Sequence, residues 1–160
     1  MKTLILYATK HETTADIAKR IAAQIDGAVI HDLKQTPVPS MSDYDCIIIG
    51  SSVYIGKIRK EAKAFLSQNA DMFREKMLGI FLCGLTEDEK NQKVMFETNI
   101  PRDILKMAEA TAFVGGIFEP EKFTRMERWL IKVGAGRTES ANTVNDDEIQ
   151  RFIDTIKENY

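Results

Sequence analysis

The feature that most constrains this chain is the alternation of two kinds of segment along its length. Apolar residues recur at helical spacing in residues 17–25, 58–66 and 149–156. Strands that alternate with helices predict an α/β fold, a doubly wound parallel sheet with helices on both faces, because right-handed crossovers carry the chain over the sheet. The expected strands are short runs rich in β-branched and large apolar residues, at 2–8, 28–33, 45–50, 77–84 and 111–118.

Length and composition are typical of one globular domain. With 160 residues, we expect a single domain over residues 1–160. The net charge of −2 leaves no basic face for nucleic acid, which we exclude as a partner. Pro101 divides the weakly patterned stretch 88–108 into two expected helices.

The two cysteines and the first residues suggest a cytoplasmic protein. Cys46 and Cys83 lie in separate apolar runs, and we interpret them as buried thiols in a reducing compartment, with a disulfide left open. The start of the chain lacks the pattern of a signal peptide, and no apolar stretch approaches the ~20 residues of a membrane span. Two histidines and two distant cysteines offer no metal site.

Ligands of doubly wound sheets bind beyond the carboxyl ends of the strands, where the strand order reverses. Three segments follow predicted strands there: residues 9–14, 51–57 and 84–90. A dinucleotide fingerprint is absent, because no glycine occurs between Met1 and Asp26.

The first of these segments places hydroxyl and cationic side chains at the start of a helix, where free backbone N–H groups favour an anion. We predict a phosphate site here. In the alternative interpretation, Thr13 and Asp16 only form a capping box. The side chains offered to the phosphate are Thr9, Lys10, His11, Thr13 and Thr14.

The second and third segments suit close approach to a ligand. Small residues precede Tyr54 and Gly56 in the second, and Gly84 and Thr86 precede an acidic helical turn in the third. An ordinary strand-to-helix turn and a plain N-cap are the alternatives.

Four stretches carry a resemblance to a known family: LILYATKHETTADIAKRIA (4–22), DYDCIIIGSSVYIGKI (43–58), GGIF (115–118) and RMERWLIKV (125–133). They resemble the flavodoxin fold, and within it the menaquinone-dependent protoporphyrinogen dehydrogenases. The resemblance implies a flavodoxin-like five-stranded parallel sheet of order 2-1-3-4-5, with FMN bound at the junction of strands one and three.

The resemblance also implies where FMN would lie. Its phosphate would bind residues 9–14, and its ring would lie between 51–57 and 84–87, with Tyr54 or Ile55 against it. The redox centre would be the flavin itself, with no catalytic side chain. The implied cofactor-binding residues are Thr9, Lys10, His11, Glu12, Thr13, Thr14, Ser51, Ser52, Val53, Tyr54, Ile55, Gly56, Cys83, Gly84, Leu85 and Thr86.

Glu12 departs from the family pattern, which most often has glycine at this position. A carboxylate in a phosphate nest is repelled by the ligand. Either the Glu12 side chain points to solvent, or FMN binds less tightly than in the family. Glu12→Gly is therefore expected to tighten FMN binding.

Three functions follow from the resemblance. The first is an FMN-dependent oxidoreductase like the protoporphyrinogen dehydrogenases, with a quinone as acceptor. The second is an electron carrier between redox proteins, which the nearly balanced charge disfavours. The third is a binding module without flavin, which Glu12 alone supports. The substrate of the protoporphyrinogen dehydrogenases is not carried over to this chain. The reason is that the segment after the fourth predicted strand opens with the acidic sequence TEDEK (86–90).

Residues 122–133 combine an apolar stripe with basic residues. This arrangement is compatible with a peripheral contact to a membrane or with a hydrophobic partner. Packing against the sheet is the alternative. The stripe comprises Phe123, Met126, Trp129, Leu130 and Val133, and the basic residues are Lys122, Arg125, Arg128 and Lys132.

Overall fold

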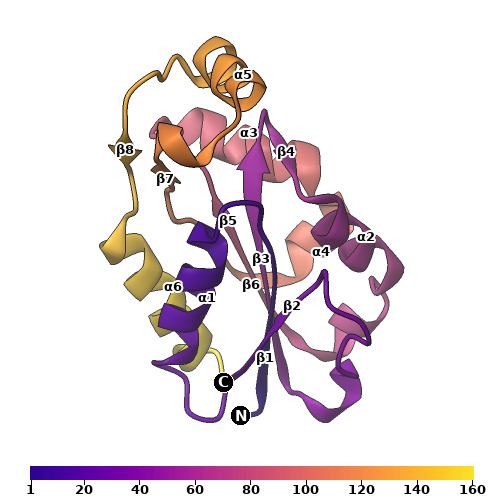
Figure 1. The fold of residues 1–160 in the computed structure, drawn as a ribbon. Coiled ribbons are helices and arrows are strands. Elements are labelled where there is room, and N and C mark those ends of the chain that lie inside the picture. The colour runs from indigo at the N-terminus through magenta and orange to yellow at the C-terminus, as the bar shows by residue number, and fades with distance from the viewer.

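A computed structural model describes residues 1–160 (Figure 1). Five parallel strands form the main sheet in the order β2-β1-β3-β5-β6. Counted along the chain without the short strand β4, this is the predicted order 2-1-3-4-5, and the predicted fold class is confirmed. The strands are β1 (Thr3–Ala8), β2 (Val29–Asp32), β3 (Cys46–Tyr54), β5 (Met77–Cys83) and β6 (Ala108–Phe113).

Six α-helices connect or follow the strands. The predicted break at Pro101 is confirmed, because Pro101 is the N-cap residue of α4 and ends the helical run before it. Short 3₁₀ turns occupy Met41–Asp43, Met72–Glu75 and Pro120–Lys122. The helices are α1 (Thr13–Ala22), α2 (Lys60–Gln68), α3 (Glu89–Asn99), α4 (Arg102–Met107), α5 (Arg125–Ala135) and α6 (Asp146–Glu158).

The hydrophobic core consists of two clusters, one on each face of the sheet. Along β1, Leu4 and Leu6 join the cluster under α2 and α4, whereas Ile5 joins the cluster under α1 and α6. Successive side chains of a strand point to opposite faces, so a sheet covered on both sides needs apolar residues at every position. This explains the uninterrupted apolar runs of the central strands.

The third strand is longer than predicted. We expected it to end at Gly50 and residues 51–57 to form a loop, but β3 continues to Tyr54 and turns back as β4 (Lys57–Ile58), which pairs antiparallel with it. The turn consists of Ile55 at φ 49° and Gly56 at φ 69°. Two positive φ angles are what a tight type I′ hairpin turn requires, so the segment can reverse within two residues.

The last strand of the sheet was also placed wrongly. We expected residues 111–118, but β6 ends at Phe113, and Ile117–Phe118 form β7, paired antiparallel with β8 (Ala141–Asn142) in a separate ribbon. Gly115, at φ 80°, redirects the chain. A Cβ atom there would lie 1.9 Å from the Thr143 carbonyl oxygen, so only glycine allows this close approach.

The β7/β8 ribbon is the base of an excursion, defined here as residues 117–142. The excursion carries α5 and lies at the end of the sheet toward which β3 points (Figure 1, orange). No residue of the excursion belongs to either core cluster. Its own buried apolar residues, Phe118 and Ile131, lie outside both clusters, so the excursion is an addition above the sheet.

Candidate functional site

A cavity of about 700 Å³ opens at the carboxyl ends of β1, β3 and β5. The three segments singled out in the sequence converge on it, together with α3, α5 and the first residues of the excursion. Both its position and its volume are those of a small-molecule site in a doubly wound sheet.

The structure brings most of the predicted cofactor residues together around this cavity. The exceptions are Glu12, Thr14 and Ser51. The predicted residues in its wall are Thr9, Lys10, His11, Thr13, Ser52, Val53, Tyr54, Ile55, Gly56, Cys83, Gly84, Leu85 and Thr86.

The three residues outside the wall have other environments. Glu12 is exposed and adopts φ 63° at the N-cap of α1. Thr14 is fully buried in the first turn of α1. The Ser51 hydroxyl donates to the Ser52 carbonyl at 3.0 Å and accepts from the Arg59 N–H at 3.0 Å, so it links β3 to the start of α2.

The N-terminus of α1 has no side-chain cap. Glu12 makes no capping hydrogen bond, and the Thr13 hydroxyl lies 3.5 Å from the His11 carbonyl, so the capping-box alternative is wrong. The N–H groups of Thr14 and Ala15 have no partner within the chain. Such free donors at a helix start favour an anion.

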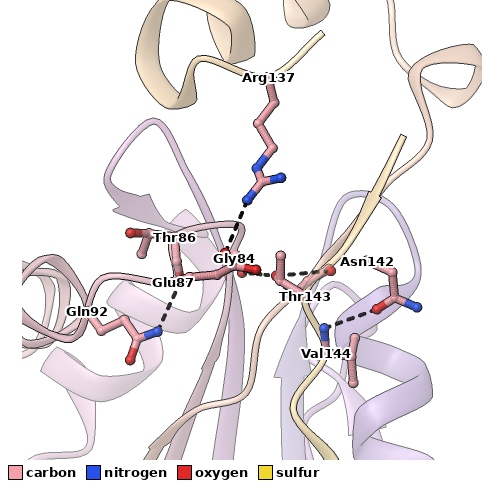
Figure 2. Close-up of polar contacts among 9 residues, drawn as sticks. Gly84, Thr86, Glu87, Gln92, Arg137, Asn142, Thr143 and Val144 are labelled. Atoms are coloured by element: carbon pink, nitrogen blue, oxygen red, sulfur yellow. Dashed lines mark hydrogen bonds and ion pairs between the residues drawn. The ribbon is translucent and has the colours of Figure 1, made fainter. Parts of the chain in front are cut away.

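The segment after β5 is capped by a residue other than the one expected. Asp88, and not Thr86, is the N-cap of α3, and its carboxylate accepts from the Asn91 N–H at 3.2 Å. The Thr86 carbonyl instead accepts from Gln92 Nε2 at 3.0 Å (Figure 2). The Thr86 hydroxyl is therefore not used by the cap.

Two polar atoms in β3 are buried without a partner: the Ser52 hydroxyl and the Tyr54 phenol oxygen. Both residues line the cavity. Unsatisfied buried polar atoms are rare in native proteins and are explained when a ligand supplies the missing partner. Burial raises the pKa of Tyr54, helped by Glu127, so the phenol stays protonated and can donate.

Glu127 of α5 reaches the segment after β1 and contacts both of its cationic candidates. It forms an ion pair with Lys10, and its Oε1 lies 3.4 Å from His11 Nε2. The Lys10 ammonium also lies 5.2 Å from the centre of the Tyr54 ring, and the His11 ring lies 3.9 Å from that of Phe123. The excursion is thus anchored to the predicted phosphate site.

The environment of Glu127 holds it ionised. Burial raises the pKa of this carboxyl, but Lys10, the Thr124 N–H and His11 outweigh burial and lower the pKa to about 2. Its Oε2 accepts from the Thr124 N–H at 2.8 Å, and the Thr124 hydroxyl accepts from the Glu127 N–H at 3.2 Å, a capping box that starts α5.

The base of the excursion is tied to the end of β5 (Figure 2). The Thr143 hydroxyl accepts from the Gly116 N–H at 3.1 Å and lies 3.4 Å from the Gly84 carbonyl oxygen. Arg137 lies 3.7 Å from Glu87 across the cavity rim. The excursion therefore contacts two of the three converging segments.

Part of the cavity wall was not expected from the sequence. Helical spacing alone gave no sign that one side of α3 and the inner side of α5 face a cavity. Glu87 and Asp88, which belong to the predicted third segment (84–90), also line the cavity. The unexpected wall residues are Asn91, Val94, Met95, Thr98, Gly116, Ile117, Phe123, Leu130, Ile131, Gly134, Ala135 and Arg137.

Helix α5 divides the predicted apolar stripe between two sides. Leu130 lines the cavity, whereas Met126, Trp129 and Val133 are 73%, 61% and 67% exposed. Packing against the sheet, the alternative for this stripe, is therefore wrong for these three residues.

Both cysteines are free and buried, as predicted. Burial raises the pKa of each thiol to about 12, so Cys83 lines the cavity as a neutral thiol and not as a nucleophile. None of the helices combines the length and the apolar composition of a membrane-spanning segment.

Comparison with known proteins agrees with the fold. The chain is 22% identical over 144 residues to a protoporphyrinogen IX dehydrogenase [quinone] of Escherichia coli strain K12, covering 83% of this chain and 78% of that protein. It superposes on oxidised flavodoxin 2 from Bacillus cereus with a TM-score of 0.59, at 20% identity and full coverage of both chains. A Fusobacterium nucleatum flavodoxin bound to flavin mononucleotide gives a TM-score of 0.53 at 16% identity, covering 99% of this chain and 98% of that one.

The flavodoxin domain model matches residues 4–143, which include the five strands of the main sheet, apart from Thr3 at the start of β1, and the excursion. The chain belongs to the flavodoxin-domain family.

Proposed function

We propose that the chain binds FMN non-covalently in this cavity and acts as an FMN-dependent oxidoreductase. The observation that carries the proposal is one cavity with an uncapped helix N-terminus at one side and orphaned hydroxyls at another. A nucleotide with a charged phosphate and a flat, polar-edged ring would supply both missing partners. The phosphate would accept from the free N–H groups, and the ring edge would pair with the buried hydroxyls. Family membership and a flavodoxin neighbour bound to FMN support the same cofactor.

The phosphate would lie at the start of α1. The free N–H groups of Thr14 and Ala15 and the hydroxyls of Thr9 and Thr13 would supply its donors. Lys10 shares its charge with Glu127, so hydrogen-bond donors would contribute more than net charge.

The flavin ring would lie between the β3–β4 hairpin and the segment after β5. Tyr54 and Ile55 would contact one side, and Leu85 and Thr86 the other. The buried Ser52 hydroxyl would gain a hydrogen-bond partner there. When bound, FMN would supply one- and two-electron transfer, while these residues hold it in place and exclude water.

The extent of the cavity favours an oxidoreductase with a substrate of its own over an electron carrier. Beyond the predicted ring site, the wall continues with Val94 and Met95 of α3 and with Leu130 and Ile131 of α5. A carrier needs only an exposed flavin edge, whereas this second, apolar part offers room beside the ring.

The acceptor is proposed on the likeness to the Escherichia coli relative, and the location on the two free, buried thiols and on the exposed apolar residues of α5. We propose a quinone as acceptor and a cytoplasmic protein with peripheral membrane contact through residues 122–133. The reduced substrate is not carried over, because Glu87 and Asp88 place negative charge at the cavity wall.

The test begins with the purified chain, stripped of any bound cofactor and titrated with FMN and with riboflavin. We expect tight FMN binding and weaker riboflavin binding, because only FMN reaches the α1 N-terminus. The loaded protein is then assayed for oxidation of protoporphyrinogen with menaquinone as acceptor. Failure to bind FMN would contradict the proposal and leave a binding module without flavin.

The carrier alternative predicts a different result from the same sample. An FMN-loaded chain that a flavodoxin reductase reduces, but that oxidises no substrate with a quinone, would be an electron carrier. We include this alternative because the chain superposes on a flavodoxin over the full length of both proteins.

A further inference from the structure

The outer side of α5 is an apolar stripe that nothing in the chain covers. Met126, Trp129 and Val133 follow one another at helical spacing and are 73%, 61% and 67% exposed. They are among the most exposed large apolar side chains of the chain. Exposed apolar residues gathered on one helix mark an interaction surface.

The exposed charges of α5 itself are all of one sign. Arg125, Arg128 and Lys132 of the same helix are exposed, and none forms an ion pair. The only acidic residue of α5, Glu127, is buried and turned toward Lys10. The outer side of α5 is therefore apolar and cationic.

We propose that the outer side of α5 docks on the surface of a bilayer that contains anionic lipids. Apolar side chains entering the interface and cations facing anionic headgroups are the two terms that bind an amphipathic helix to such a surface. The position of α5 at the extreme end of the molecule leaves it free to meet a flat surface (Figure 1).

Charge distinguishes a bilayer from a protein partner here. A protein partner would have to present an acidic surface shaped to this stripe, whereas an anionic bilayer is flat and acidic throughout. Binding to a bilayer also grows with each inserted apolar group and each basic residue.

Docking would place the bilayer next to the cavity. The inner side of α5, at Leu130 and Ile131, lines the cavity, so one helix of about 10 Å diameter would separate the two. If the proposed redox function holds, a lipid-soluble electron acceptor would reach the flavin from the membrane. The docking itself does not depend on FMN.

The experiment uses the full chain with vesicles of phosphatidylcholine alone and of phosphatidylcholine with 30% phosphatidylglycerol. Trp129 is the only tryptophan, so its emission reports directly on this surface. We expect co-sedimentation and a blue shift of Trp129 emission with the anionic vesicles, both weakened by added salt.

Matched variants distinguish binding through the outer side of α5 from general electrostatic attraction between the protein and anionic vesicles. Arg128→Gln with Lys132→Gln is expected to lower the partition coefficient about thirtyfold, and Met126→Ser with Val133→Ser is expected to reduce the blue shift. Lys60→Gln with Lys63→Gln, the same charge change on exposed residues of α2, is expected to leave binding unchanged.

Absence of binding, or equal binding to neutral vesicles, would overturn the proposal. So would a dimer at micromolar concentration that shifts Trp129 emission without vesicles, because the stripe would then be a self-association surface. FMN titration of the same samples keeps a failure here distinct from a failure of the proposed redox function.

Discussion

Glu12 combines an unusual backbone conformation with an unusual residue type. Its φ of 63° is one that side-chain-bearing residues adopt at a cost of about 1–2 kcal/mol. Its side chain is exposed and absent from the cavity wall, which agrees with the outward orientation considered from the sequence. The strain is therefore in the backbone, and solvent screens the charge.

Glu12→Gly is expected to raise the free energy of unfolding by about 1 kcal/mol and to tighten FMN binding, because the start of α1 relaxes. Urea unfolding and FMN titration measure the two effects. Glu12→Gln is the control, since it removes the charge but keeps the strained backbone, and it is expected to change FMN affinity little. Equal effects of the two substitutions would mean that charge dominates.

Glu127 makes the free energy of unfolding depend on pH in the acidic range. Its pKa of about 2 is below the ~4.3 of an unfolded glutamate, so its ionised form stabilises the native state above about pH 4 and loses this effect as pH falls toward 2. Glu127→Gln is expected to cost about 2 kcal/mol at pH 7 and much less at pH 2.5.

The measurement is denaturant unfolding of both proteins between pH 2.5 and pH 7. Glu121→Gln, at an exposed position of the same excursion, serves as the control and is expected to follow the wild type. A pH-independent difference between wild type and Glu127→Gln would show that packing, and not the ion pair with Lys10, accounts for the loss.

At the scale of elements, the β3–β4 hairpin is a strained connection that points into the cavity. Ile55 is β-branched and half-exposed, yet it adopts φ 49° in a turn that asparagine or glycine would accept more readily. Strain kept in a ligand-facing turn is consistent with a functional role for its side chain.

Ile55→Asn is expected to raise the free energy of unfolding by about 1 kcal/mol and to weaken FMN binding, because the turn relaxes while an apolar contact to the ring is lost. Thermal unfolding and FMN titration give the two values. Ile55→Val, which keeps both the strain and an apolar side chain, should change neither by much. If Ile55→Asn left FMN affinity unaltered, Ile55 would not contact the ring.

At the scale of the whole molecule, the excursion leaves the sheet and returns to it at one place. The Thr143 N–H donates to the Gly116 carbonyl at 2.8 Å, so the ends of the excursion meet at its base. Neither core cluster contains a residue of 117–142. The excursion completes the cavity, whereas the two clusters hold the sheet together.

Replacing residues 117–142 by Asn-Gly is expected to leave a folded sheet whose unfolding stays cooperative. FMN binding should weaken, because Phe123, Leu130 and Ile131 leave the cavity wall, and vesicle binding should disappear. Circular dichroism, FMN titration and sedimentation measure these outcomes. Loss of the folded state would show that the excursion contributes to the core.

Local patterns in the sequence were sufficient for the alternation of strands and helices, but they misplaced the ends of β3 and β6, and the order of the sheet came from the family likeness. Because β1 is buried on both faces, its apolar run is continuous and can be recognised without its neighbours. Pro101 ends a helix through its own ring and missing N–H, whatever that helix packs against. The carboxyl-end rule singled out the three segments that converge on the cavity, and the family likeness implied FMN as their ligand.

Tertiary structure alone decided where side chains of the excursion point. The same apolar stripe is compatible with a buried or an exposed helix, and only the packing of α5 shows that Leu130 faces the cavity while Trp129 faces solvent. The pairing of Glu127 with Lys10 joins residues more than a hundred positions apart. Periodicity reports a residue's neighbours along its own element, whereas these contacts depend on how distant elements meet.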